Sequence, residues 1–77
     1  MGELDRVRWH CRRGLLELDL TLTRFVDQHY AALTASEKAA FEALLDRPDD
    51  RLWDLISGRE EPETADLAAV VRWLRSG

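Results

Sequence analysis

The chain has 77 residues, which is enough for one domain spanning residues 1–77 and leaves little room for a deep catalytic cavity behind a complete core. Hydrophobic residues make up 45% and charged residues 34%, a normal balance for a folded protein, which argues against disorder. The net charge of −4 argues against general nucleic-acid binding, because phosphate contacts need clustered Lys and Arg. Composition therefore favours a small binding module over an independent enzyme.

Compartment is indicated by cysteine usage and by the lack of apolar runs. Cys11 is the single cysteine and has no internal disulfide partner, which fits a reducing compartment. No apolar run approaches the roughly 18 residues that a bilayer-spanning helix needs. The N-terminus lacks the apolar stretch of a signal peptide. We expect a cytoplasmic bacterial protein without a membrane contact, and a monomer.

The first predicted helix covers residues 4–13. Leu4, Val7 and Cys11 fall at i, i+3 and i+7, which places them on one helical face. Gly14 is a suitable stop, because glycine accepts the left-handed conformation that ends many helices.

The second segment, residues 15–33, carries two patterns. Four leucines alternate with polar residues, which is a strand signal: Leu16, Leu18, Leu20 and Leu22. A helical stripe also fits and continues past the alternation: Leu15, Leu18, Leu22, Phe25, Val26, His29 and Leu33. The longer stripe favours a helix.

The third segment opens on a capping box, in which the Thr34 hydroxyl accepts from the Glu37 amide and Glu37 reaches back. Its apolar face is formed by Ala40, Phe41, Leu44 and Leu45, and Pro48 lies beyond its end because proline cannot continue a helix.

The fourth helix is expected to start at Asp49 or Asp50, either of which can cap it, and to stop before Gly58. The fifth follows Pro62 and Thr64 and has an apolar stripe of Leu67, Val70, Val71 and Leu74. Five short helices with brief connections predict an all-α fold, a compact five-helix bundle.

Catalytic and metal-binding interpretations are weak. His10 and Cys11 are adjacent, so on a helix they point about 100° apart and do not form a nucleophile–base pair. With His29 they match no compact zinc pattern, and His29 is better explained as a packed histidine. The acidic cluster Asp46, Asp49, Asp50 and Asp54 lacks the rhythm of a calcium loop. We expect no catalytic residue, no metal site and no stably bound cofactor.

The tryptophans Trp9, Trp53 and Trp73 are each either core residues or surface anchors. Core packing is the favoured interpretation for any one of them, with Trp73 covering the edge of the core. Trp9 and Trp53 have polar neighbours, and an incompletely packed tryptophan is a common binding anchor.

The stretch from Arg12 to Glu17 allows two interpretations. One is simply the end of one helix and the start of the next. The other is a docking point: Gly14 lets another backbone approach, and Arg13 offers a forked donor for a carboxylate or phosphate. Glu17 falls in the first turn of the second helix, where the helix dipole favours its charge. The residues alone leave both open.

The sequence around this stretch resembles the SdhE family, the FAD assembly factors of succinate dehydrogenase. The family hallmark Arg-Gly-x-x-Glu is met by Arg13, Gly14 and Glu17, preceded by Trp-x-Cys-Arg and followed by Leu-Asp. Agreement extends over nearly the whole chain, in residues that include Phe25, Tyr30, Glu37, Leu44, Leu45, Asp46, Asp50, Leu52, Trp53 and Gly58. The family's short C-terminal tail is largely absent.

This resemblance implies five helices and an assembly function. The expected partner is the flavoprotein subunit of succinate dehydrogenase, or of fumarate reductase, whose FAD becomes attached to a histidine of that subunit. FAD belongs to this client, and the chemistry is the client's own. The implied contact residues are Arg13, Gly14 and Glu17, with Arg8, Asp50 and Trp53 as neighbouring surface. Arg13 and Glu17 are expected to fix the client's orientation by charge-assisted hydrogen bonds.

The alternative is a generic helical interaction module, such as an antitoxin-like partner. A DNA-binding version would depend on the arginines near the N-terminus, against the net charge of the chain.

Overall fold

A computed structural model describes residues 2–76. Within them the chain forms five α-helices: α1 (Glu3–His10), α2 (Leu16–His29), α3 (Ala35–Leu45), α4 (Asp49–Ser57) and α5 (Ala65–Ser76). A single 3-10 turn, η1 (Tyr30–Ala32), follows α2. The prediction of an all-α five-helix fold is confirmed, and so is the helical interpretation of the second segment. No helix within residues 2–76 combines the length and apolar character that a bilayer crossing requires.

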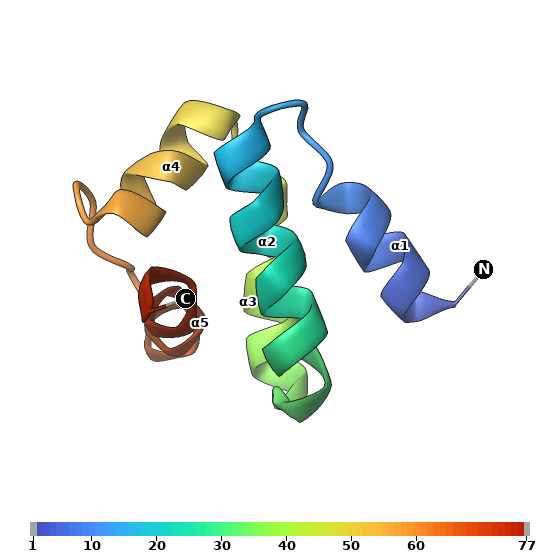
Figure 1. The fold of residues 1–77 in the computed structure, drawn as a ribbon. Helices are drawn as coiled ribbons and strands as arrows, with labels where there is room; N and C mark the ends of the chain where they lie inside the picture. Colours follow the sequence, from blue (N-terminus) through green and yellow to red (C-terminus); the bar gives the residue numbers. More distant parts are fainter. Residues whose placement is uncertain (1, 77) are drawn as a thin grey trace.

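Helix α2 lies at the centre of the arrangement (Figure 1). Helix α1 flanks it on one side, α4 and α5 lie on the other, and α3 passes behind it. The stacking of α2 on α3 is made by Phe25 and Phe41, whose ring centroids are 4.8 Å apart. Among residues 2–76, no other helix lies over the outer face of α2 between α1 and α4 (Figure 1).

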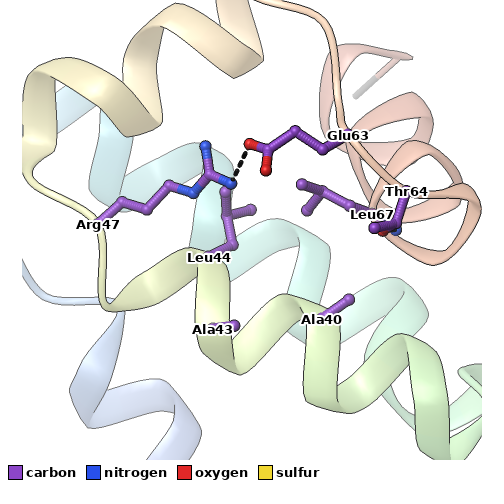
Figure 2. A pocket seen from close by; sticks show the side chains of 7 residues that line it. All are labelled: Ala40, Ala43, Leu44, Arg47, Glu63, Thr64 and Leu67. Carbon is purple, nitrogen blue, oxygen red and sulfur yellow. Dashed lines mark hydrogen bonds and ion pairs between the residues drawn. The ribbon is translucent and has the colours of Figure 1, made fainter.

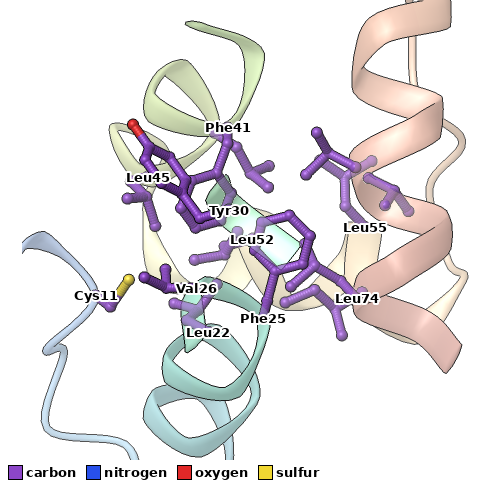
Figure 3. Packing of buried hydrophobic residues seen from close by; sticks show 14 of the residues in the cluster. Cys11, Leu22, Phe25, Val26, Tyr30, Phe41, Leu45, Leu52, Leu55 and Leu74 are labelled. Carbon is purple, nitrogen blue, oxygen red and sulfur yellow. The ribbon is translucent and has the colours of Figure 1, made fainter. Parts of the chain in front are cut away.

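The core is a single apolar cluster drawn from all five helices and η1 (Figure 3). Phe41, Leu22 and Leu52 are each 0% exposed at its centre. The helical stripe predicted for the second segment is buried at Leu18, Leu22, Phe25, Val26 and Leu33. The prediction that Leu15 belongs to this buried stripe is wrong, because Leu15 precedes the first turn of α2 and is 50% exposed.

Helix α1 is shorter than predicted. It ends at His10 rather than Arg13, and Cys11 closes it by donating its N–H to the carbonyls of Val7 and Arg8. The expected apolar face is buried at Val7 and Cys11 but not at Leu4, which is 43% exposed because only the C-terminal part of that face is covered. Gly14 is left-handed, with φ of 80°, but it stands in the following loop and does not end the helix.

The predicted starts of α3 and α4 are both confirmed, since α4 begins at Asp49, but the predicted cap of α4 is wrong. Thr34 Oγ1 accepts from the Glu37 amide at 3.1 Å, and Glu37 Oε1 accepts from the Thr34 amide at 2.9 Å, a complete capping box. In α4 the N-cap is Pro48 and no side chain caps the helix. The carboxylate of Asp49 bonds to Arg13 instead, so the proposed cap is wrong.

Candidate functional site

The loop between α1 and α2, residues 11–15, is held in place by Asp19. The Asp19 carboxylate accepts the backbone N–H of Arg13 at 2.7 Å and that of Gly14 at 3.1 Å. Because these two N–H groups bond to Asp19 and not to carbonyls one turn earlier, the hydrogen-bond pattern of α1 does not continue into the loop. Sequence reasoning missed this role of Asp19, because no spacing rule predicts a carboxylate that folds back onto a loop five and six residues earlier.

Arg13 points into the molecule from this loop. Its side chain is only 13% exposed. Nη1 donates to the Arg47 carbonyl and to Asp49 Oδ1, both at 3.2 Å, and Nη2 donates to the Leu45 carbonyl. The guanidinium therefore ties the α1–α2 loop to the junction between α3 and α4, and its donors are not turned toward solvent.

Gly14 forms an open corner beside this buried arginine. It is exposed, and a Cβ built on it would meet no atom within 4 Å. Its φ of 80° is in the region that favours glycine, so the residue supplies both the sharp turn and the flat surface.

Glu17 is exposed in the first turn of α2, directly after this corner. With Leu15, Leu18 and Trp53 of α4 it lines an open hollow of about 200 Å³. The structure thus brings Glu17 and Trp53 together next to Gly14. Asp50 lies three residues before Trp53, on the same side of α4, and is exposed.

Arg8 is separated from this hollow by α2. Its Nη2 lies 2.5 Å from Asp27 Oδ1, an ion pair that joins α1 to α2, and its side chain is 49% exposed. Arg8 therefore belongs to the α1 side of the surface, opposite Trp53.

All three tryptophans are partly exposed, so core packing is the wrong interpretation for Trp9 and Trp53, whereas Trp73 covers the edge of the core as predicted, beside Phe25 and Leu74. Trp9 is 70% exposed, with the Arg12 guanidinium carbon 5.7 Å from its ring centroid. Trp53 is 37% exposed. Trp73 is 45% exposed and stacks on His29 with a centroid distance of 4.3 Å, which confirms His29 as a packed histidine.

Cys11 belongs to the core, with 0% exposure and its sulfur directed at the apolar cluster (Figure 3). Burial raises the pKa of its thiol to about 11, so it is protonated at neutral pH and a poor nucleophile. The His10 imidazole lies 3.5 Å from Asp46 Oδ1, at the end of α3. The imidazole thus faces Asp46 while the thiol faces the core, so the two side chains do not form a catalytic pair.

A second hollow, of about 190 Å³, lies between α3 and α5 (Figure 2). Methyl groups of Ala40 and Ala43 line one side, and the ion pair of Arg47 Nη2 with Glu63 Oε1, at 2.9 Å, crosses its rim. None of the predicted contact residues lines it. The predicted residues therefore gather around α2 and not at this hollow.

Comparison with known proteins identifies the family. The family model described as "Flavinator of succinate dehydrogenase" matches residues 5–77. A relative from Coxiella burnetii named "FAD assembly factor SdhE" is 43% identical over 67 residues, covering 87% of this chain and 82% of the relative. Proteins of the same name from Pseudomonas aeruginosa and Methylococcus capsulatus are 44% and 42% identical, covering 94% and 99% of this chain and 86% and 92% of theirs. The chain belongs to the family of the flavinator of succinate dehydrogenase.

Proposed function

We propose that this protein is an FAD assembly factor, which binds the flavoprotein subunit of succinate dehydrogenase and promotes covalent attachment of FAD to it. The observation that carries the proposal is the family match over residues 5–77, with relatives named as FAD assembly factors. The resemblance also makes the flavoprotein of fumarate reductase a candidate client. We propose that the protein works as a monomer in the cytoplasm.

The Gly14 corner is the proposed point of contact with the client. A partner backbone can approach there because no side chain stands in the way. Glu17 and Trp53 offer a carboxylate and an aromatic ring beside it, and Asp50 and Arg8 extend the surface on either side. Glu17 would orient the client through a charge-assisted hydrogen bond.

The contribution of Arg13 is different from the one expected from the sequence. Since its Nη1 and Nη2 donors already serve Leu45, Arg47 and Asp49, and its Nε is buried, we propose that Arg13 acts indirectly, by fixing the loop that presents Gly14. It is a positioning residue, and a direct bond from Arg13 to the client would require breaking these contacts.

The protein would act by favouring one state of the client and not by catalysis. Binding that is tighter to the flavinylation-competent conformation shifts the client toward it, so that its histidine and the flavin meet. FAD remains the client's cofactor, and the bond is formed by groups of the client.

Reconstitution tests this function. Apo-flavoprotein subunit of succinate dehydrogenase is incubated with FAD, with and without this protein, and covalent flavin is measured by its fluorescence after denaturing electrophoresis. We expect a higher rate of flavinylation with the protein present, and an equal rate would contradict the proposal. The same assay with the fumarate reductase flavoprotein decides whether it is a second client, and equilibrium dialysis against FAD alone should show no retained flavin.

A further inference from the structure

The carboxylate of Asp19 uses both of its oxygens on the loop that carries Gly14. Oδ1 accepts the backbone N–H of Arg13 at 2.7 Å, and Oδ2 accepts the backbone N–H of Gly14 at 3.1 Å. Hydrogen bonds to an ionised acceptor are roughly twice as strong as those between neutral groups. Asp19 therefore holds two consecutive residues of the loop directly by their backbone.

Helix α2 gives this carboxylate a fixed position. Asp19 belongs to the first turn of α2, where the helix dipole favours a negative charge. Its own N–H donates to the Leu15 carbonyl at 2.8 Å, and Leu18 and Leu22 of the same helix are buried in the core. The two loop amides are therefore attached to a helix that is itself anchored.

Packing does not hold Gly14 in its conformation. The residue is exposed, and a Cβ built on it would meet no atom within 4 Å. Glycine also has the widest range of allowed backbone conformations, so sterics alone do not enforce its φ of 80°. Arg13 ties the loop to the junction between α3 and α4, but it does so through a long side chain. Among residues 2–76, the hydrogen bond to the Gly14 N–H comes from Asp19.

We infer that Asp19 is a positioning residue for client binding, which keeps the Gly14 corner in the conformation that the client recognises and does not touch the client. The inference rests on the proposed function, in which the Gly14 corner is the point of contact. It is supported by the direction of the carboxylate, whose two oxygens face the loop amides, and by the open surroundings of Gly14.

This role determines which rate constant Asp19 controls. When only a fraction of the free molecules has the competent conformation, the apparent affinity falls by that fraction. Loss of the Asp19 carboxylate lowers this fraction, so association slows, while the complex once formed keeps its contacts and dissociates at the same rate. A residue that touches the client shows the opposite pattern, because the loss of contacts acts mainly on dissociation.

Asp19→Asn is the test variant, and two other variants serve as controls. Asparagine keeps the shape of aspartate, but one of its two terminal atoms is a donor and would face a backbone N–H. Asp66→Asn makes the same change at an exposed aspartate in the first turn of α5. Thr34→Ala weakens the start of α3, at the far end of α2 from the Gly14 corner, and controls for a general loss of stability (Figure 1).

Amide hydrogen exchange, followed by NMR, and the kinetics of binding to the apo-flavoprotein subunit are measured for the full chain. We expect the Arg13 and Gly14 amides to exchange faster in Asp19→Asn than in wild type. The association rate constant should fall about tenfold, and the dissociation rate constant should change less than about twofold. Both controls should keep the two rate constants within about twofold of wild type.

Asp19→Glu is a second test variant that retains the charge. It displaces the carboxylate by one methylene group, so it should show the same pattern as Asp19→Asn but more weakly. If Asp19→Asn does not fold, as judged by circular dichroism, the comparison with the controls is made with Asp19→Glu.

Three outcomes would overturn the inference while the proposed function stands, because wild type still binds in each. If Asp19→Asn dissociates faster and its Gly14 amide exchanges as in wild type, Asp19 contacts the client directly. If its amides exchange faster but both rate constants are unchanged, the client does not need a fixed corner. If Thr34→Ala slows association as much at an equal loss of stability, the effect is one of stability alone. A wild type that does not bind the flavoprotein contradicts the function as well.

Discussion

Arg13 shows how a residue of the Arg-Gly-x-x-Glu motif can serve the fold and the surface at once. Its guanidinium is held by the Leu45 and Arg47 carbonyls and by Asp49, and the residue after it is the open Gly14. The sequence allowed for an open glycine, because glycine has no side chain to place there, and the family resemblance favoured it over a simple helix stop. It did not predict the inward course of Arg13, since Arg13 and Arg47 are 34 positions apart and no local pattern relates them.

Replacing Arg13 should destabilise the protein. Arg13→Ala removes a charged donor from two carbonyls and a carboxylate, and we expect the free energy of unfolding to fall by about 2 kcal/mol in urea titrations. Arg13→Lys should recover part of this, because an ammonium group cannot span all three acceptors. Arg72→Ala, at an exposed position on α5, should change stability by no more than about 0.5 kcal/mol. Equal stability of Arg13→Ala and Arg72→Ala would show that the internal contacts contribute nothing.

Cys11 makes stability depend on alkaline pH. Burial raises the pKa of the folded thiol from 9.0 to about 11, so the unfolded chain releases this proton first as pH rises. The stabilisation is complete below pH 9 and is lost as pH rises to about 11. Over this window the free energy of unfolding should fall by up to about 1.4 kcal/mol per pH unit from this group.

Cys11→Ala isolates this contribution. Burial also raises the pKa of Tyr30, to about 12, so wild type and variant share the slope that the tyrosine causes. In chemical denaturation at a series of pH values, the variant should lose stability less steeply between pH 9 and 11 than wild type. Identical slopes would mean that the thiol is not protected from ionisation.

At the scale of the elements, apolar periodicity predicted the helices better than it predicted their ends. The stripe from Leu18 to Leu33 was sufficient to choose helix over strand for the second segment, because it continues beyond the alternating leucines. Leu16 and Leu20, which created the strand signal, are exposed and lie outside the core. The predicted C-terminal end of α1 and the predicted cap of α4 were wrong because Asp19 and Asp49 bond to the α1–α2 loop, and those contacts exist only in the folded chain.

The start of α3 is the exception, since its cap is local. Thr34→Ala removes the oxygen that accepts from the Glu37 amide, and we expect a loss of about 1 kcal/mol of unfolding free energy. Ser36→Ala lies in the same turn, exposed and outside the capping box, and should be close to neutral in the same thermal or urea titration. If both variants are equally stable, the capping box does not stabilise the helix start.

At the scale of the whole molecule, the positions of the large apolar residues say more about its surface than their number does. A complete core is built without any tryptophan, which leaves Trp9, Trp53 and Trp73 at the surface. Tryptophan is usually packed in small proteins, so composition alone favoured the core, and only the positions of the helices show otherwise. Two of the three, Trp9 and Trp53, stand on opposite sides of the same face of α2, where the Gly14 corner also lies.

The central claim is that the Gly14 corner is where the client docks, and one pair of variants tests it. Gly14 and Gly58 have φ of 80° and 90°, and a Cβ at either would meet nothing within 4 Å, so Asn at each position carries a similar backbone cost. Gly58 stands at the end of α4, away from the loop that carries Gly14. The measurement is the affinity of Gly14→Asn and Gly58→Asn for the apo-flavoprotein subunit of succinate dehydrogenase. We predict that Gly14→Asn loses binding while Gly58→Asn keeps it, at similar thermal stability. Equal binding by the two variants would contradict the account.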